Sequence, residues 1–284
     1  MNQFHHDDIM YVTSVTLKVK DIKTMLAFYM NVLKMKLIYK MGRTYSLGTE
    51  SDRVLVVLVA DENALLKRQR TTGLYHFALL LPTRHDLGVF LNYYLAGEHP
   101  LSGASDHAVS EALYLNDPEG NGIEIYCDRP SSAWRFNEDG VVMTTEALDH
   151  VSLLKEKGKY DKIPDDTVMG HLHLHVNNID EAKAFFVDTL GFNKMLDYGP
   201  SASFISDGQY HHHLAYNTWL GTTNRHRSDD ETGLMAYEVN VPARRMGNLV
   251  DKLKHAGVEY VRGDGEVTFK DINHVTVRLV LVTS

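Results

Sequence analysis

Two stretches of the sequence follow one plan, in which an alternating strand leads into an amphipathic helix. The first stretch covers residues 12–33 and the second covers residues 169–190. When the two are overlaid, Phe28 falls on Phe185 and the apolar positions at both ends coincide. A repeated unit of this kind cannot bury its apolar face alone, so the repeat restricts the chain to folds in which copies pack on one another.

Cap and turn residues mark the limits of these units. Asp21 and Asn178 stand where helix N-caps belong, because their side chains can accept hydrogen bonds from the first free backbone N–H groups. Gly191 suits the end of the second helix, where a left-handed residue is common. Three short alternating segments follow this helix, and we predict strands at residues 192–198, 202–206 and 211–217.

Two further units repeat the pattern more weakly. In the second unit we predict a strand at residues 74–81, a helix after Pro82 to about residue 96, and strands at residues 112–115 and 122–127. In the last unit we predict a strand at residues 234–241, a helix after Pro242 to residue 255, and strands at residues 258–262, 266–270 and 274–282. The sequence therefore predicts an α+β protein of four tandem βαβββ units.

The four units divide the chain into two halves. We predict an N-terminal half at residues 9–128, a C-terminal half at residues 168–284, and a polar connection at residues 129–167 that runs over the surface. With 284 residues in total, each half has enough chain to bury a sizeable core.

Composition limits the partners and the compartment. The formal net charge of −8 argues against a nucleic-acid or anionic membrane surface, and no apolar run approaches the roughly 20 residues of a membrane span. Cys127 is the single cysteine, which excludes an internal disulfide framework and fits the cytoplasm. The sixteen histidines stand out, since histidine is the commonest metal ligand and a proton carrier near neutral pH.

Two of the four units have a histidine at the same position of the repeat. Five residues before the end of the first strand, the four units carry Ser14, His76, His171 and Ala236 in chain order. In the last strand of the second unit, Glu124 lies within an apolar run, where an unpaired carboxylate would be costly. Two imidazoles and one carboxylate on one face are the ligands of non-haem Fe(II) oxygenases, so we predict a metal site at His76, Glu124 and His171.

Other histidines compete for these roles. His173 and His175 alternate with His171 along a strand and point the same way, and His173 is the alternative ligand. His171 is preferred because its place in the repeat matches that of the histidine in the second unit. We expect His5 and His6 to lie in a frayed terminus without a role.

A longer motif occupies residues 105–124. It consists of His107, the pair Leu113-Tyr114, the turn Asp117-Pro118-x-Gly120 and Glu124, and the second half adds the run His211-His212-His213-Leu214-Ala215. Together with the βαβββ plan, these segments resemble the vicinal oxygen chelate superfamily of glyoxalases, bleomycin-resistance proteins and extradiol dioxygenases. The whole chain is most similar to catechol 2,3-dioxygenases of the bacillus type.

The resemblance implies a role for each matching residue. The three predicted ligands would hold Fe(II), or Mn(II), which the same ligand set suits. His212 would be the acid–base residue, and Tyr114 and His107 would hydrogen-bond the substrate oxygens. The substrates would be a catechol and dioxygen, and the reaction would be extradiol cleavage to a product of the 2-hydroxymuconic semialdehyde type. A homo-oligomer is usual among the look-alikes.

The position of the motif in the chain is unusual for the family it resembles. In the commoner two-domain extradiol enzymes the metal site comes from the third and fourth units, whereas here the motif ends the second unit. We therefore expect units two and three to pair around the metal. Units one and four would then form a metal-free partner barrel, giving two cupped-sheet barrels.

Two other functions share this scaffold. An isomerase or thiol transferase of the glyoxalase type usually needs a fourth protein ligand, and the matching strand of the third unit offers histidines at 211–213 instead of glutamate. A non-enzymatic, drug-sequestering binding protein would not need His76, Glu124 and His171 in register. Both features favour the dioxygenase.

Overall fold

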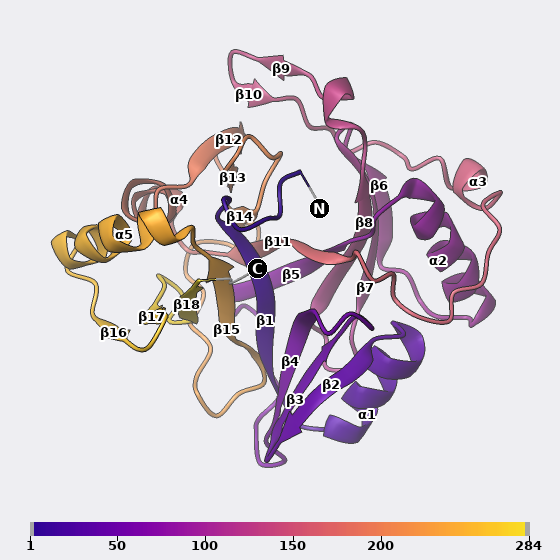
Figure 1. Ribbon diagram of the computed structural model, residues 1–284, viewed down its shortest axis with the longest axis horizontal. Helices are drawn as coiled ribbons and strands as arrows, with labels where there is room; N and C mark the ends of the chain where they lie inside the picture. Colours follow the sequence, from indigo (N-terminus) through magenta and orange to yellow (C-terminus); the bar gives the residue numbers. More distant parts are fainter. Residues whose placement is uncertain (1–2, 282–284) are drawn as a thin grey trace.

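Two eight-stranded sheets form the framework of the protein, as seen in a computed structural model that describes residues 3–281 (Figure 1). The strand order is β16-β17-β18-β15-β1-β4-β3-β2 in the first sheet and β12-β13-β14-β11-β5-β8-β7-β6 in the second. The first sheet therefore joins units one and four, and the second joins units two and three. The predicted α+β class and the predicted pairing of units are confirmed.

The first sheet has β1 and β15 antiparallel at its centre. Unit one supplies β1 (Tyr11–Val19), α1 (Ile22–Ala27) with a π-helical turn (Phe28–Val32), β2 (Lys36–Met41), β3 (Thr44–Gly48) and β4 (Val54–Ala60). Unit four supplies β15 (Gly233–Asn240), α5 (Ala243–His255), β16 (Tyr260–Arg262), β17 (Glu266–Lys270) and β18 (Thr276–Val280). The last predicted strand extended to residue 282, which lies outside the described residues.

The second sheet has β5 and β11 antiparallel at its centre. Unit two supplies β5 (Gly73–Leu80), α2 (Arg84–Ala96), β6 (Gly103–Asp106), β7 (Ser110–Asn116) and β8 (Gly122–Asp128). Unit three supplies β11 (Val168–His175), α4 (Ile179–Lys183) with a π-helical turn (Ala184–Thr189), β12 (Asn193–Tyr198), β13 (Ala202–Ser206) and β14 (Leu214–Asn217). Strand β6 was not predicted, because its Gly-Ala-Ser-Asp sequence has little β propensity.

The predicted helix limits are confirmed. Asp21 and Asn178 each accept hydrogen bonds from the backbone N–H groups two and three residues further on, and Gly191 has a φ of +81° after the second helix. In both copies the α-helix continues as a π-helical turn at the corresponding place. The repeat therefore includes the irregular part of the helix. Within residues 3–281, no helix combines the length and the apolar character that a membrane span requires.

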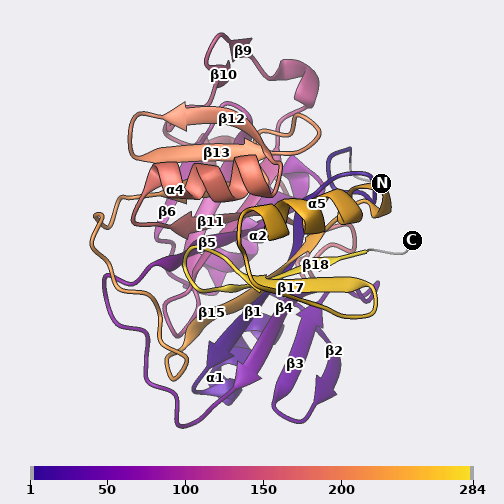
Figure 2. The same ribbon diagram turned by 90° about the vertical axis from the view of Figure 1, so that its left-hand side faces the viewer.

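Apolar side chains of both sheets meet in one core. Phe77 and Leu79 of β5 face this core, and side chains from β1, β11 and the helices belong to the same cluster. Helices α4 and α5 lie side by side between the sheets (Figure 2). Because successive residues of a strand face opposite ways, the alternate residues of β5, His76 and Ala78, lie on the other face of the second sheet.

The segment between the halves, residues 129–167, has structure of its own. It contains a 3₁₀ turn (Ser131–Ala133), the short strands β9 (Phe136–Asn137) and β10 (Gly140–Val141), and α3 (His150–Leu153). The β9–β10 ribbon lies at the rim of the molecule, above β12 and β13 (Figure 2). The domain boundaries at residues 128 and 168 stay a prediction, since each sheet combines strands from both halves.

Candidate metal centre

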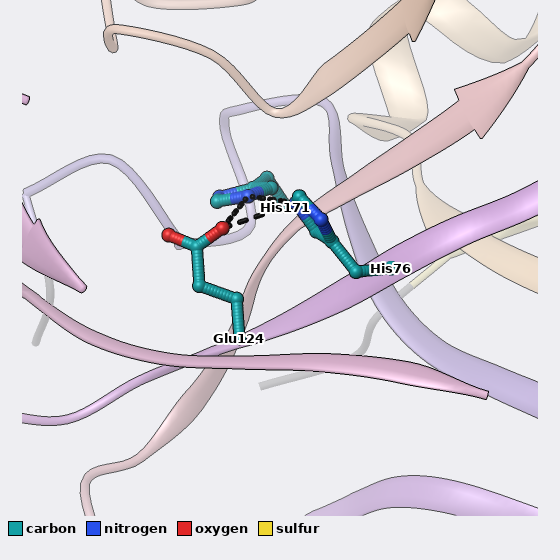
Figure 3. A group of neighbouring side chains, drawn as sticks. All are labelled: His76, Glu124 and His171. Carbon is teal, nitrogen blue, oxygen red and sulfur yellow. Dashed lines mark hydrogen bonds and ion pairs between the residues drawn. The ribbon is translucent and has the colours of Figure 1, made fainter. Parts of the chain in front are cut away.

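Three neighbouring strands bring the predicted ligands together. His76 lies on β5, Glu124 on β8 and His171 on β11, and their side chains converge on one face of the sheet (Figure 3). Glu124 and His171 are both in register with Ala78 of β5, from opposite sides. His76 is two residues from Ala78 and therefore shares its face. The small side chain of Ala78 leaves the space between the three ligands open.

The ligand atoms are close to one another. Glu124 Oε2 lies 3.0 Å from His76 Nε2 and 3.2 Å from His171 Nε2, and the two nitrogens are 3.2 Å apart. Metal–ligand bonds of about 2.1 Å at right angles place ligand atoms about 3.0 Å apart, while tetrahedral angles place them about 3.4 Å apart. The spacing therefore fits one face of an octahedral ion, with the remaining positions open to other ligands.

The protonation states of Glu124 and His171 suit a metal. Burial raises the pKa of the Glu124 carboxyl, but His171 and His76 outweigh it and hold the pKa well below its usual range. Burial lowers the pKa of His171 to about 4. A carboxylate and a neutral imidazole are the forms that bind cations without first releasing a proton. Among the described residues, these three side chains are the group whose donor atoms are placed to hold a metal ion.

The ring of His171 is held by packing. Its centroid lies 4.0 Å from that of His212 and 5.0 Å from that of Tyr126. Its Nδ1 atom is buried and has no hydrogen-bond partner among the described residues. Packing against these two tilted rings therefore orients His171, where a hydrogen bond to Nδ1 would often do so.

A cavity of about 240 Å³ opens onto the ligands. The side of the cavity away from the ligands is largely aromatic and apolar, and no lysine or arginine is among the described residues that line it. The lining residues are Tyr75, His76, Ser105, His107, Tyr114, Glu124, Met143, Thr144, Thr145, His171, His173, Tyr198, Phe204, His212 and Trp219. All of the predicted site residues therefore reach one cavity.

His107 and Tyr114 form a fixed pair on one wall. His107 Nδ1 lies 2.7 Å from the Thr144 carbonyl oxygen, which can only accept, so Nδ1 carries the hydrogen. His107 Nε2 lies 2.7 Å from Tyr114 Oη and accepts the hydrogen of that hydroxyl. The Tyr114 oxygen therefore keeps lone pairs free toward the cavity.

His212 lines the cavity, but it does so from a loop and not from the predicted strand. The prediction placed residues 211–217 in a strand, whereas β14 begins at Leu214 and the histidine run precedes it. His211 instead bonds Asp128 through Nε2 at 2.9 Å, and His213 bonds the Phe4 carbonyl oxygen. Of the three histidines in the run, the one predicted to face the site does so, held by loop contacts and not by strand alternation.

The expectation for His5 was wrong. Its ring is 5 % exposed and its Nε2 donates to the Gly170 carbonyl oxygen at 3.0 Å. It packs edge-on against Tyr210 and His213. The N-terminal segment is thus fixed beneath β11, which a sequence of polar residues with few apolar neighbours did not suggest.

Sequence reasoning missed part of the lining. It did identify His173, the alternative ligand that alternates with His171; this residue is buried, lines the cavity and accepts a hydrogen bond from Asn217 Nδ2 at 2.9 Å. Tyr75, Phe204 and Met143 also line the cavity. Met143 lies in the connecting segment, for which no repeat provided an expectation.

On the matching face of the first sheet, residues 3–281 form no comparable group. Ser14 and Ala236 stand at the places of His76 and His171, and Ser14 Oγ donates to Glu238 Oε2 at 3.0 Å. Arg278 lies 3.6 Å from the same carboxylate. This face therefore has an ion pair where the second sheet has its ligands.

Known proteins resemble this chain in sequence and in fold. Residues 11–125 match the Glyoxalase/Bleomycin resistance protein/Dioxygenase superfamily. The chain is 41% identical to a catechol-2,3-dioxygenase of Bacillus subtilis (strain 168) over 278 residues, which covers 95% of this chain and 96% of that protein.

Two solved structures share the fold at low sequence identity. A Bacillus subtilis protein has a TM-score of 0.67 at 12% identity and covers 97% of this chain and 86% of its own. Glyoxalase I of Zea mays has a TM-score of 0.56 at 14% identity and covers 95% and 92%. The chain therefore belongs to the Glyoxalase/Bleomycin resistance protein/Dioxygenase superfamily, in the dioxygenase family that includes the Bacillus subtilis catechol-2,3-dioxygenase.

Proposed function

We propose that the protein cleaves catechol or a substituted catechol with dioxygen at a non-haem Fe(II) site, next to the two hydroxyl groups. The observation that carries the proposal is the face formed by His76, Glu124 and His171, whose ligand atoms lie 3.0–3.2 Å apart. The relative at 41% identity supports the same reaction. The product would be of the 2-hydroxymuconic semialdehyde type.

A bound ferrous ion would supply positive charge that favours ionisation of a chelated catechol, and open positions for a second ligand. The protein itself supplies the cavity that receives the substrate. This cavity is lined by several aromatic side chains, whose faces fit a flat ring. Since no lysine or arginine is among the described lining residues, the cavity suits catechols without a carboxylate substituent.

His212 is suited to move the proton. Burial lowers its pKa well below 6.5, so the ring is neutral and can accept a hydrogen from a substrate hydroxyl. Its ring packs against that of the proposed ligand His171, with centroids 4.0 Å apart, and both side chains line the same cavity, which supports the role. We therefore assign the acid–base role to His212.

Tyr114 and His107 are suited to hold a substrate oxygen. Because the Tyr114 hydroxyl donates to His107 Nε2, its oxygen is an acceptor toward the cavity. His107 acts behind Tyr114 by keeping that hydroxyl in one orientation.

The alternatives are less well supported. A glyoxalase-type isomerase or thiol transferase would need a fourth protein ligand, and among the described residues the group placed to hold a metal has three members. A binding protein without a metal would gain nothing from a buried carboxylate between two histidines.

The test is reconstitution of the purified protein with ferrous iron under anaerobic conditions, followed by catechol and then air. We expect a yellow product, with one dioxygen consumed per catechol. His212→Gln should keep the iron and lower kcat by about 10²-fold or more. Failure to bind iron together with no colour from catechol, methylcatechols or chlorocatechols would contradict the proposal.

Three finer points belong to the same proposal. Mn(II) is the other metal that suits these ligands, and parallel loading with manganous ion compares the two. We infer a cytoplasmic enzyme from the lone Cys127, which is buried and unpaired. We also infer a homo-oligomer, which analytical ultracentrifugation tests.

A further inference from the structure

Strand β8 contributes further residues to the site besides the predicted ligand Glu124. Glu124, Tyr126 and Asp128 alternate along it with core residues and therefore share the face of the metal centre. Asp128 ends the strand, and its carboxylate Oδ1 accepts hydrogen bonds from His211 Nε2 at 2.9 Å and from Tyr210 Oη at 3.1 Å. The roles described so far leave Asp128 without a function.

His211 connects this carboxylate to His212. The Nδ1 atoms of the two neighbouring imidazoles lie 2.7 Å apart, a hydrogen-bond distance. The ring of His211 is fully buried and packs against Tyr210 and Trp134. The ring of His212 is wedged between His171 and Phe204. Packing therefore holds both imidazoles in the orientation that joins them.

When both imidazoles are neutral, the bonds decide which nitrogen carries each hydrogen. Asp128 accepts only, so Nε2 of His211 is the N–H that it receives. A neutral imidazole has one N–H, so Nδ1 of His211 is then an acceptor. The hydrogen between the rings must belong to Nδ1 of His212. His212 is left with a lone pair on Nε2, the ring nitrogen that remains available to the cavity.

We infer that Asp128, acting through His211, sets the tautomer of His212 so that its Nε2 can accept a proton from the substrate. Asp128 and His211 are positioning residues, because they reach the reaction only through His212. The inference rests on the proposed function for its catalytic consequence, while the tautomer itself can be measured without any turnover. The hydrogen bond made by one ring nitrogen is what decides the state of the other.

The first test reads the tautomer directly. Long-range ¹H–¹⁵N spectra of histidine-labelled, full-length protein loaded with diamagnetic Zn(II) should show His212 with its hydrogen on Nδ1, the signal being assigned by its loss in His212→Gln. Asp128→Asn keeps the shape, and its amide can donate one hydrogen to His211 Nε2 and the other to the Tyr210 hydroxyl, which then donates to Tyr126 Oη. We expect that variant to reverse both rings and move the His212 hydrogen to Nε2.

The matched control is Tyr210→Phe, which removes the other hydrogen bond to Asp128, together with the one to Tyr126, and keeps the ring that packs against His211. It should leave the His212 hydrogen on Nδ1. The inference is overturned if the parent protein carries that hydrogen on Nε2, or if Asp128→Asn leaves it on Nδ1. Loss of the Nδ1 signal in Tyr210→Phe would also overturn it, by making the effect one of packing.

The second test uses the iron-loaded enzyme. Asp128→Asn should lower kcat for catechol about 10²-fold with KM and iron content unchanged, since Asp128 is neither among the residues that line the cavity nor in the group placed to hold the metal. His211→Asn keeps an acceptor near the place of Nδ1, so it should retain more activity than His211→Leu. In the His211→Asn background, Asp128→Asn should have no further effect.

The two proposals fail in different ways. If the parent cleaves no catechol while the spectra show the expected reversal, the proposed reaction is wrong and the tautomer assignment holds. If the parent is active and Asp128→Asn retains full kcat, the reaction holds and the positioning role is overturned.

Discussion

Ala78 has no donor atom for a metal, yet it lies next to two of the three predicted ligands in the sheet. It is fully buried and stands in register with Glu124 on one side and His171 on the other. A longer side chain at this place would fill the space between the donor atoms. At the scale of single residues, the site therefore depends on a small side chain as much as on three polar ones.

Removing one ligand should abolish metal retention without unfolding the protein. Glu124→Gln and His76→Ala each break the two-histidine, one-carboxylate set, and we expect metal affinity to fall about 100-fold or more. Glu111→Gln is the matched control, since Glu111 is equally buried but pairs with Arg84 outside the site. Metal content after gel filtration checks both, and a Glu124→Gln protein that retains iron like the parent would show our ligand assignment to be wrong.

Cys127 should be inert in the folded protein. Burial raises the pKa of its thiol to about 12, so almost no thiolate is present at neutral pH. We expect no reaction with a thiol reagent such as DTNB at pH 8 until the protein is unfolded, when one equivalent should react. Rapid labelling of the native protein would contradict the burial of this side chain.

At the scale of elements, the segment between the halves is part of the site. Met143, Thr144 and Thr145 follow β10 and line the cavity, and the Thr144 carbonyl oxygen orients His107. The β9–β10 ribbon that precedes them packs on β12, close enough that a Cβ on Gly140 would lie 1.8 Å from the Met195 carbonyl oxygen. The ribbon therefore determines the position of the cavity wall formed by residues 143–145.

A side chain at Gly140 should move the wall. Gly140 has a φ of +122° as well as the close contact, so Gly140→Ala must displace the ribbon. We expect KM for catechol to rise about 10-fold or more because the wall moves relative to the metal, with iron content unchanged. Steady-state kinetics measure the change.

The control for that variant is Gly42→Ala. Gly42 also has a positive φ, of +55°, but it lies in the β2–β3 turn of the other sheet with open space around it. It should cost about 1–2 kcal/mol of stability and leave KM unchanged. Equal effects of the two substitutions on KM would mean that backbone strain, and not the displaced wall, is responsible.

At the scale of the whole molecule, the fold keeps many imidazoles neutral by burying them between its layers. Burial lowers the pKa of His5 to about 4, although the Gly170 carbonyl oxygen and Asp128 raise it. Burial likewise lowers the pKa of His175 to about 4. Such groups gain a proton when the chain unfolds at mildly acid pH, which ties the stability of the fold to pH.

Stability of the metal-free protein should therefore fall as the pH falls from 6.5 toward 4. In that window the unfolded state, with histidine pKa values near 6.5, binds more protons than the folded state, so protonation favours unfolding. At pH 5 the cost is about 2 kcal/mol for each such histidine. Urea denaturation at pH 7 and pH 5 measures the difference.

A matched pair of variants isolates one of these histidines. His5→Gln should reduce the loss between pH 7 and pH 5 by about 2 kcal/mol. His255→Gln, at the exposed end of α5, should leave the loss as it is. An unchanged pH dependence in His5→Gln would argue against a neutral, buried His5.

Sequence by itself determined what depends on short-range order. The period of two along strands, the caps at Asp21 and Asn178 and the repeat of units all follow from local hydrogen bonding and side-chain alternation. The repeat also placed His76 and His171 at equivalent positions, and with Glu124 this was enough to predict a group whose donor atoms the structure brings together.

Only the tertiary structure decided how distant parts complete the site. His76 and His171 are 95 residues apart in sequence, and it is the pairing of β5 with β11 that brings their rings together. The histidine run before β14, the wall after β10 and the burial of His5 depend on packing between segments that have no common pattern. Such contacts are set by shape and by the loss of water on burial, which a periodic sequence does not encode.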